Sequence, residues 1–334
     1  MTDVPEEVRR LAADRDERRK AKDFAGADAL RDRIAELGFA VIDSPQGPRF
    51  EPIASAPAEG AKRLRPEEIA SVLEQPGGFD ATVQWVVEGW PEDVARALAG
   101  FRQNEGGRTV QYVVADVTGQ DPSAFGEGVE VIPLEDGTGW GAARNAGLKR
   151  SLGRIVVLVD GSVEPTGDVL GPLEAALADP AIGVCGPFGI VTSDLQDFEA
   201  SEGPEVDAIE GYLMALRREV LHAAGLFDEK FRWYRTADIE YSFRVKDAGL
   251  KAVVVPVPVT RHEHRMWFNT PPDERAKWSK RNYYRFLDRF RGRFDLLVGG
   301  EPPPDAKPSR AAGGGGGIAC DEGCAMIPGT ERAC

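Results

Sequence analysis

The segment Arg154-Ile-Val-Val-Leu-Val-Asp160 is the clearest indication of the fold in this sequence. Its uninterrupted run of aliphatic residues is typical of a strand that is buried on both faces of a parallel sheet. Further strands and helices are expected to alternate at residues 82–87 (strand), 91–101 (helix), 110–116 (strand), 129–132 (strand) and 141–152 (helix). Strands separated by helices predict an α/β fold with a largely parallel, Rossmann-like sheet.

Two of these strands end on a carboxylate, at Asp116 and Asp160. In open parallel sheets, ligands bind in the crevice at the carboxyl ends of the strands. Ser162 and Glu164 follow Asp160 at alternate positions, where their oxygen atoms would suit a divalent cation and a diphosphate. The same residues also fit a strand end followed by an ordinary turn, and the sequence leaves both interpretations open.

Glycines at residues 137–141 precede a helix that is expected to start near Gly141, with Arg144 and Asn145 in its first turns. Free backbone N–H groups and a guanidinium at a helix start would suit a phosphorylated ligand. A flexible loop before an ordinary helix has the same composition.

Later in the chain, Asp238 opens another expected helix, where it is either a helix cap or a functional acid. Two of the three histidines, His262 and His264, follow a strand expected from residue 253 onward. Histidines at the end of a strand suit a metal site, and they equally fit an ordinary surface pair.

Taken together and in this order, the segments of residues 80–295 resemble family 2 glycosyltransferases of the GT-A fold. The segments that carry the resemblance are VVADVTG (113–119), GAARNAG (141–147), IVVLVDGSVEP (155–165), GYLMALRREVL (211–221), GLFDEKF (225–231) and ADIEYSFRVKDAG (237–249). The last two look like the family's GxFDE segment and its catalytic ED helix. The spacing from Pro256 to His262 resembles the end of the family's core.

The resemblance implies an enzyme that moves a hexosyl or related sugar, with inversion, from a nucleotide diphosphate donor to an acceptor hydroxyl. Asp238 would be the general base. Mg²⁺ or Mn²⁺ would be held by Asp160, Ser162 and His262. The residues implied to contact the nucleotide sugar are Glu88, Asp116, Gly141, Arg144, Asn145 and Asp160. A saccharide or a lipid-linked molecule would be the acceptor.

Three departures from the family pattern keep an alternative open. Ser162 stands where the family usually has a second acid, the first strand ends in Glu88-Gly-Trp, and Ala237 precedes the expected base. A degenerate, non-catalytic binding or scaffold protein of the GT-A fold would show the same losses.

Residues 1–52 form a separate expected module of two helices, broken near Gly26, and a hairpin over residues 39–50. The segment from Arg18 to Phe50 resembles the helical C-terminal end of bacterial cysteinyl-tRNA synthetases. The module therefore allows a second alternative, an RNA-associated protein, although its interleaved acids favour a solvated helix used for packing or dimerisation. Residues 53–78 are expected to be a linker, followed by the GT-A domain at 79–298 and a disordered Pro/Gly-rich tail at 299–334.

Charge and hydropathy exclude some partners. The 334 residues carry 41 Lys and Arg against 55 Asp and Glu, a net charge of −14, which argues against nucleic-acid capture by the field of the whole protein. No apolar run approaches the roughly 20 residues of a membrane span, and the first residues do not form a signal peptide, so we expect a cytoplasmic chain.

Aromatic residues and cations mix over residues 267–294, which fits either peripheral membrane contact or aromatic packing on the core.

Overall fold

The computed structural model describes residues 5–21, 23–37, 39–42, 48–52 and 62–300, and the chain divides into two compact units, one within residues 1–59 and one within 60–334. The first unit contains helices α1 (Glu6–Lys20) and α2 (Phe24–Glu36) and the antiparallel strands β1 (Phe39–Ile42) and β2 (Arg49–Pro52). Val8, Ala12, Ile34 and Phe39 form its small core. The predicted hairpin is confirmed by this pairing.

The break between the two helices lies before Gly26, which is part of α2. The carboxylate of Asp23 accepts a hydrogen bond from the backbone N–H of Gly26 at 3.0 Å and so caps the start of α2. Because an aspartate cap satisfies the free N–H groups of a helix start, the helix begins at the cap and tolerates the glycine inside its first turn.

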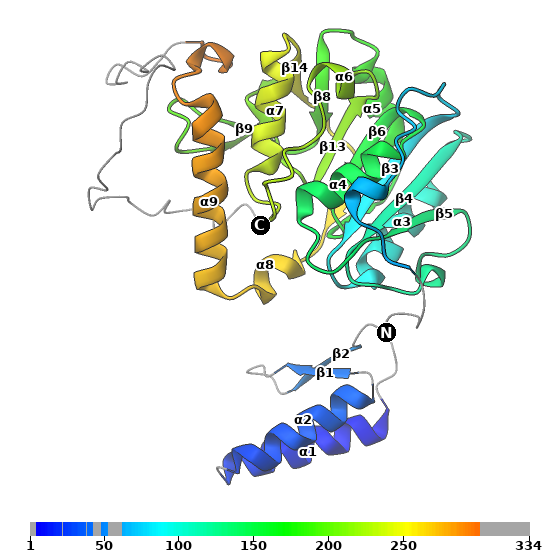
Figure 1. Cartoon of the computed structure of the whole chain (residues 1–334), viewed down its shortest axis with the longest axis vertical. Coiled ribbons are helices and arrows are strands. Elements are labelled where there is room, and N and C mark those ends of the chain that lie inside the picture. The colour runs from blue at the N-terminus through cyan, green and yellow to red at the C-terminus, as the bar shows by residue number, and fades with distance from the viewer. Residues whose placement is uncertain (1–4, 22, 38, 43–47, 53–61, 301–334) are drawn as a thin grey trace. The chain divides into compact units, whose positions relative to one another are not determined.

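The second unit is built on an eight-stranded mixed sheet, drawn from cyan to yellow in Figure 1. Its strand order is β11-β14-β8-β13-β6-β3-β4-β5. Strands β5, β4, β3 and β6 are parallel, β8 and β14 are parallel to each other, and β13 lies antiparallel between β6 and β8. The strands are β3 (Phe79–Val87), β4 (Val110–Asp116), β5 (Val129–Pro133), β6 (Gly153–Val159), β8 (Ile182–Gly186), β11 (Glu205–Val206), β13 (Leu213–Arg217) and β14 (Lys251–Val254).

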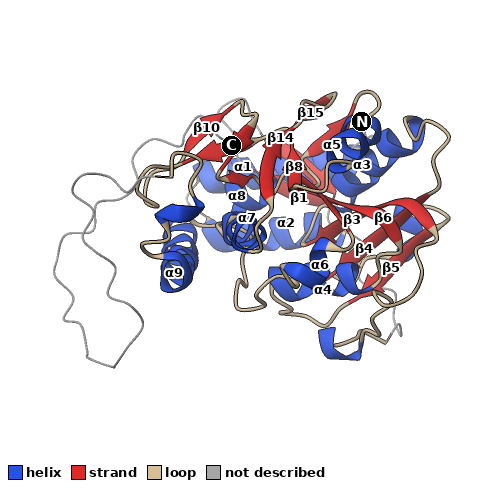
Figure 2. Ribbon diagram, turned by 90° about the horizontal axis from the view of Figure 1, so that it is seen from above, coloured by secondary structure: helices blue, strands red, loops and turns tan. Residues whose placement is uncertain are grey.

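Helices cover both faces of this sheet (Figure 2). Helices α3 (Pro91–Gln103) and α5 (Leu170–Leu177) pack on one face, where Trp85, Phe101 and Leu173 belong to one apolar core. On the other face pack α4 (Trp140–Lys149), α6 (Val220–Ala223) and α7 (Ala237–Asp247). The predicted α/β class with a parallel-rich sheet is therefore confirmed.

Part of the expected linker packs on the second unit. The N–H of Leu64 donates to the carbonyl of Pro133 at 2.8 Å, and Ile69 and Val72 are buried. A short 3₁₀ helix spans Pro66–Glu68. Scattered apolar residues without periodicity suggested a linker, but Leu64 and Ile69 belong to one apolar cluster with Ala143 and Ala146 of α4, so residues 62–78 differ from that expectation.

The chain after β14 runs differently from the single strand that we expected. Pro256 and Pro258 interrupt it, since proline has no N–H for a strand ladder. The strand resumes as β15 (Val259–Arg261), which pairs with β7 (Val163–Pro165), while β9 (Gly189–Val191), β10 (Glu199–Ser201) and β12 (Ala208–Ile209) form a small separate sheet.

Helices α8 (Arg265–Asn269) and α9 (Pro272–Phe290) and the short helix η3 (Phe294–Leu296) end the described chain. Helix α9 runs alongside α7 in Figure 1, and its Phe286 and Phe290 are fully buried against Phe243 of α7. These aromatics therefore cover the core, whereas Lys280 and Arg281 remain exposed. No helix among the described residues is long and apolar enough to cross a membrane. The expected disorder of the tail falls on residues 301–334, outside the described part.

Candidate active site

The carboxyl ends of the parallel strands lie at one edge of the sheet, because Val87 pairs with Asp116 and Asp116 with Pro133. Asp116 is fully buried there. Its carboxylate accepts hydrogen bonds from the N–H and hydroxyl of Thr118, at 2.9 and 2.8 Å, and from the N–H of Gln120 at 2.6 Å. The carboxylate of Asp116 therefore shapes the loop that follows β4.

Asp160, directly after β6, is the centre of a second group of polar side chains. One of its oxygens accepts hydrogen bonds from the N–H of Ser162 at 2.8 Å and from the Ser162 hydroxyl, and the other lies 3.1 Å from Nε2 of His264. Burial alone would raise the pKa of Asp160, but His264 and Ser162 outweigh it and lower the pKa to about 2. Asp160 is therefore an anion at any physiological pH.

His264 is the histidine whose ring faces Asp160. The ring of His262, which the sequence indicated as a ligand, faces Glu164 instead. Nε2 of His262 is 2.6 Å from a carboxylate oxygen of Glu164, because Glu164 pairs with Thr260 across β7 and β15 and His262 follows two residues later. His264 is the N-cap of α8, and its Nδ1 accepts the N–H of Trp267 at 3.2 Å. An accepting Nδ1 leaves the ring proton on Nε2, which faces Asp160.

Glu88 and Arg144 add two more charges around Asp160. Burial and the charge of Asp160 raise the pKa of Glu88 to about 7, although His264 and Arg144 lower it. Arg144 is buried, donates to the carbonyl of Gln84 at 3.0 Å, and has its pKa lowered by burial to about 10. Two carboxylates, a guanidinium and an imidazole thus share a desolvated site, a pattern that is frequent in active sites.

The start of α4 is used differently from the phosphate-binding role that the sequence suggested. The N–H groups of Trp140 and Gly141 donate to the carbonyls of Arg232 and Phe231, at 3.1 and 2.9 Å. A side chain at Gly141 would lie 2.8 Å from the carbonyl of Asp228. These two amides are therefore committed to the close packing of residues 228–232 on α4.

Asn145 has the same structural task. Its amide donates to the carbonyl of Phe227 and accepts the N–H of Phe227, both at 2.9 Å. A buried amide that pairs with both polar groups of one backbone residue fixes that residue firmly. Asn145 therefore anchors the segment 225–231 on α4.

Asp238 lies in the first turn of α7, half-buried. One carboxylate oxygen accepts the N–H of Gly211 at 2.7 Å and the other the N–H of Ile239 at 2.9 Å. Burial raises the pKa of Asp238, even though these N–H groups and Arg235 lower it. A carboxylate with a raised pKa is a stronger base than a free one.

Glu210 is a second carboxylate beside Asp238, and the sequence did not reveal it. Burial and the charge of Asp238 raise the pKa of Glu210 to about 7, against the opposing effect of Arg261 and Arg235. Glu210 lies in the connection between β12 and β13. The next residue, Gly211, is 27 residues away from Asp238 along the chain but donates a hydrogen bond to it. Glu210 is therefore an acidic neighbour of Asp238, which Ala237 is not.

Residues 210–212 join the two groups. Gly211 donates to Asp238, as described, and the N–H of Asp160 donates to the carbonyl of Tyr212 at 2.9 Å. The ring of Tyr212 also meets the ring of His264 edge-on, with centroids 6.0 Å apart. Asp160 and Asp238 are therefore held by neighbouring residues of one short segment.

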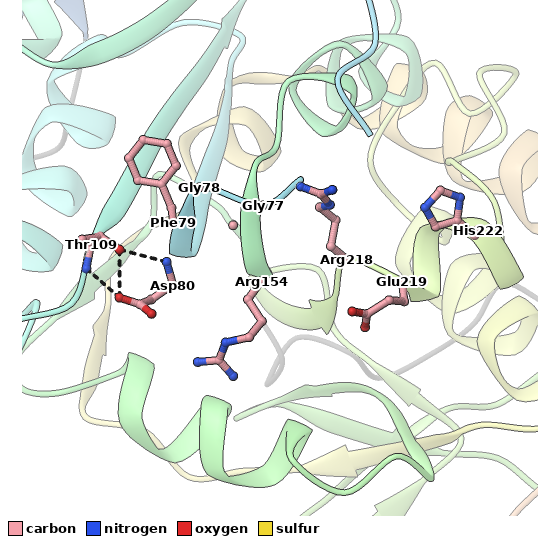
Figure 3. A pocket seen from close by; sticks show the side chains of 10 residues that line it. Gly77, Gly78, Phe79, Asp80, Thr109, Arg154, Arg218, Glu219 and His222 are labelled. Carbon is pink, nitrogen blue, oxygen red and sulfur yellow. Dashed lines mark hydrogen bonds between the residues drawn. The ribbon is translucent and has the colours of Figure 1, made fainter. Parts of the chain in front are cut away.

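A cavity of about 510 Å³ lies at the opposite edge of the sheet, at the amino ends of β3 and β6 (Figure 3). Its Asp80 carboxylate is held by the N–H and hydroxyl of Thr109, at 2.9 and 2.8 Å, and its Arg154 pairs with Glu174 at 3.0 Å. Because these charges already have partners, the cavity is less suited to chemistry than the strand ends around Asp160.

Comparison with known proteins identifies relatives of the segment that carries these side chains. Residues 109–240 match the sequence model of "Glycosyl transferase family 2", a span that contains Asp116, Asp160 and Asp238. The described fold is similar to that of GalNAc-T7, crystallised with UDP, GalNAc and Mn²⁺, with a TM-score of 0.53 and 17% identity over 65% of this chain and 50% of that one.

The N-terminal part has different relatives. The cysteine–tRNA ligase of Chlamydia pneumoniae is 50% identical over 50 residues, and that of Parvibaculum lavamentivorans is 60% identical over 42 residues. These matches cover 15% and 13% of this chain but only 10% and 9% of the ligases. Both predicted resemblances are confirmed: residues 109–240 match the glycosyl transferase family 2 model, and a short N-terminal segment is similar to part of cysteine–tRNA ligases.

Proposed function

We propose that this chain transfers a sugar from a nucleotide diphosphate donor to an acceptor hydroxyl, with inversion at the anomeric carbon. Asp238 takes the proton of the acceptor hydroxyl while the acceptor oxygen forms a bond to the anomeric carbon. The bond from that carbon to the diphosphate breaks, and the nucleoside diphosphate leaves with the electron pair. The raised pKa of Asp238 and the backbone bonds that orient its carboxylate are the observation that carries this proposal.

Asp160 suits a divalent cation that keeps the donor's phosphates among its ligands, and His264 joins it when its ring proton moves from Nε2 to Nδ1, which removes the acceptor of the Trp267 N–H. The facing atoms of Asp160 and His264 are 3.1 Å apart, and Ser162 adds a hydroxyl. No group of three or more His, Cys, Asp and Glu side chains that would hold a metal alone occurs in the described parts of the chain. Mg²⁺ and Mn²⁺ commonly bind through one or two carboxylates together with substrate phosphates, so the residues fit such an ion.

When bound, Mg²⁺ or Mn²⁺ would neutralise charge on the departing diphosphate. His264 replaces His262 in the ligand set that we propose, with Asp160 and Ser162 retained. Glu88, Asp116 and Arg144 are proposed to face the nucleotide from the strand ends. Arg144 fits that place because it is buried close to Asp160, and its Nε has no hydrogen-bond partner in the described structure.

The proposal is tested first by thermal-shift measurements with UDP, GDP, dTDP and their sugars, with and without Mn²⁺. A ligand that binds only the folded state raises the stability of that state. Transfer is then measured with the donor that binds. Asp238→Asn should lower kcat by a factor of about 10² or more and leave the donor Kd unchanged.

Asp273→Asn, on the exposed first turn of α9, is the matched control and should behave like the parent chain. Unchanged turnover in Asp238→Asn would refute the assignment of the base. A chain that binds the nucleotide but neither hydrolyses nor transfers the donor would establish the non-catalytic scaffold instead.

The cations of the N-terminal unit do not favour a second, RNA-binding function. Lys20 pairs with Glu17 and Arg18 with Asp23, both at 2.7 Å. Acidic side chains so close to these cations weaken the positive field that phosphate binding needs. Packing or dimerisation of this helical unit remains the use that we propose.

A further inference from the structure

Arg235 and Arg261 are two arginines whose guanidinium groups lie over aromatic rings. The guanidinium carbon of Arg235 lies 5.0 Å from the ring centre of Trp267. That of Arg261 lies 3.8 Å from the ring centre of Tyr212 and 4.9 Å from that of Phe188. Stacking fixes the plane of a guanidinium and leaves its N–H edge free to bind a planar or tetrahedral anion with two hydrogen bonds.

Neither guanidinium has a carboxylate within 4 Å among the residues that the structure describes, whereas many other arginines of this unit are paired. Arg96, for example, pairs with Asp93 at 2.7 Å and Arg108 with Glu174 at 2.6 Å. Arg235 and Arg261 are also half-buried, so their charge is only partly solvated. A half-buried cation without a counter-ion in the protein is a place where a ligand can supply one.

Both arginines lie near Asp238, the proposed base, and near Glu210. Arg235 precedes Asp238 by three residues at the start of α7, and Arg261 stacks on Tyr212, next to the Gly211 that holds Asp238. Their positive charges reach Glu210, whose pKa they lower against burial. Glu210 itself has no ion pair in the described structure.

We propose that Arg235 and Arg261 bind an anionic group, a phosphate or a carboxylate, on the acceptor. This inference rests on the proposed function, because it takes Asp238 as the base that meets the acceptor hydroxyl. The two guanidiniums adjoin that base, whereas the donor's diphosphate is assigned to the group around Asp160. An acceptor held by its anionic group would place a hydroxyl at Asp238, and a neutral acceptor would leave two half-buried cations without a counter-ion at ion-pair distance.

The donor's diphosphate offers the same chemistry, since Arg261 also lies close enough to His264 to lower its pKa. The experiment therefore uses a probe that is free of sugar and nucleotide. Inorganic phosphate is titrated into the full chain and followed by ³¹P NMR line broadening, with potassium chloride as the control for ionic strength. One series uses the free chain, and a second uses the chain saturated with the nucleoside diphosphate that the thermal-shift screen identifies.

Arg235→Gln and Arg261→Gln should each weaken phosphate binding at least tenfold, because a charge-assisted pair of hydrogen bonds is lost. Arg281→Gln is the matched control: Arg281 also stacks on a ring, that of Trp278 at 5.5 Å, but lies exposed on α9. Thermal melting curves establish that each variant is folded. Arg235→Lys keeps the positive charge but loses the planar guanidinium that donates two parallel hydrogen bonds. Its phosphate affinity should therefore lie between those of the parent chain and Arg235→Gln.

The proposal predicts that phosphate still binds when the nucleotide site is full. Displacement of phosphate by the nucleotide would assign the arginines to the donor and overturn the proposal. Absence of phosphate binding, or equal affinity in the parent and both Gln variants, would overturn it as well. Failure of every nucleotide to bind would instead refute the proposed function, and phosphate binding to the free chain would still report on the two arginines.

Discussion

The bond between Gly211 and Asp238 allows a sharp test of the proposed base. A side-chain carbon added at Gly211 would lie 3.2 Å from Cβ of Asp238 and 3.3 Å from one of its carboxylate oxygens. Both distances are shorter than ordinary van der Waals contact, so Gly211→Ala forces the two residues apart by a few tenths of an ångström. The 2.7 Å hydrogen bond from the Gly211 N–H to Asp238 must then lengthen or break.

The size of the effect follows from the energy of that bond. A hydrogen bond to a charged group contributes about 1.5–3 kcal/mol, and about 1.4 kcal/mol corresponds to one pKa unit. The Gly211 N–H favours the ionised carboxylate and lowers the pKa of Asp238, so weakening this bond raises the pKa further. A general base acts when ionised, and the acidic limb of the kcat–pH profile should therefore move upward by up to about one or two units.

The assay is kcat for sugar transfer between pH 5 and 9, with donor and acceptor saturating. Gly78→Ala is the control, because a side-chain carbon there meets nothing within 4 Å. It should leave the profile unchanged. An acidic limb at the same pH in Gly211→Ala and the parent chain, with the variant folded, would show that Asp238 is not the group whose ionisation governs catalysis.

Three other changes test the surroundings of the site. The pKa of Glu88 is raised to about 7, so between pH 4.5 and 7 the folded state holds a proton that the unfolded state has lost, and the free energy of unfolding falls as the pH rises. Glu88→Gln should remove this fall and raise the free energy of unfolding at pH 8 by about 1–3 kcal/mol. Urea titrations at pH 5 and 8 measure the difference. Equal gains at both pH values would contradict the cause. Asp160→Ala should abolish the effect of Mn²⁺ on nucleotide binding in calorimetric titrations, and a parent chain whose binding ignores a chelator would count against the metal site. Asp207→Ala should lower the free energy of unfolding, measured in urea, by about 3–5 kcal/mol, because Lys246, 3.0 Å away and only 7% exposed, becomes an unpaired buried charge. A loss below about 1 kcal/mol would show that water solvates the Lys246 ammonium in the variant.

The strands were predictable because their apolar runs are local and continuous. Residues 110–116 and 154–159 became β4 and β6, and the carboxylates at their ends, Asp116 and Asp160, lie at the expected edge of the sheet. Asp238 at the start of α7 was equally visible, since a helix start is a local feature. Each of these predictions depended on neighbours within one strand or one turn.

The features that local sequence did not reveal depend on contacts between distant parts of the chain. The sequence offered no basis for choosing between His262 and His264, because the choice is made by the pairing of β15 with β7 and by the cap of α8. Gly141 and Asn145 look like parts of a phosphate loop, yet the segment 225–231 occupies their polar groups from more than 80 residues away. Glu210 carried no local signal, since its place beside Asp238 comes from the antiparallel insertion of β13.

Two of the departures from the family pattern, Ser162 and Ala237, have neighbours in the folded chain that favour an intact site over a degenerate one. Ser162 is not an acid, but its N–H and hydroxyl hold the carboxylate of Asp160 and help to keep it ionised. Glu210 stands in for the acid missing at position 237, and Glu88 lies within the charge field of Asp160. A scaffold without catalysis would gain stability from neutral residues in place of carboxylates that lack an ion pair, such as Glu210, since an unpaired charge in a desolvated site is costly. The presence of four half-buried acids, Glu88, Asp160, Glu210 and Asp238, therefore favours the proposed catalytic site over a scaffold.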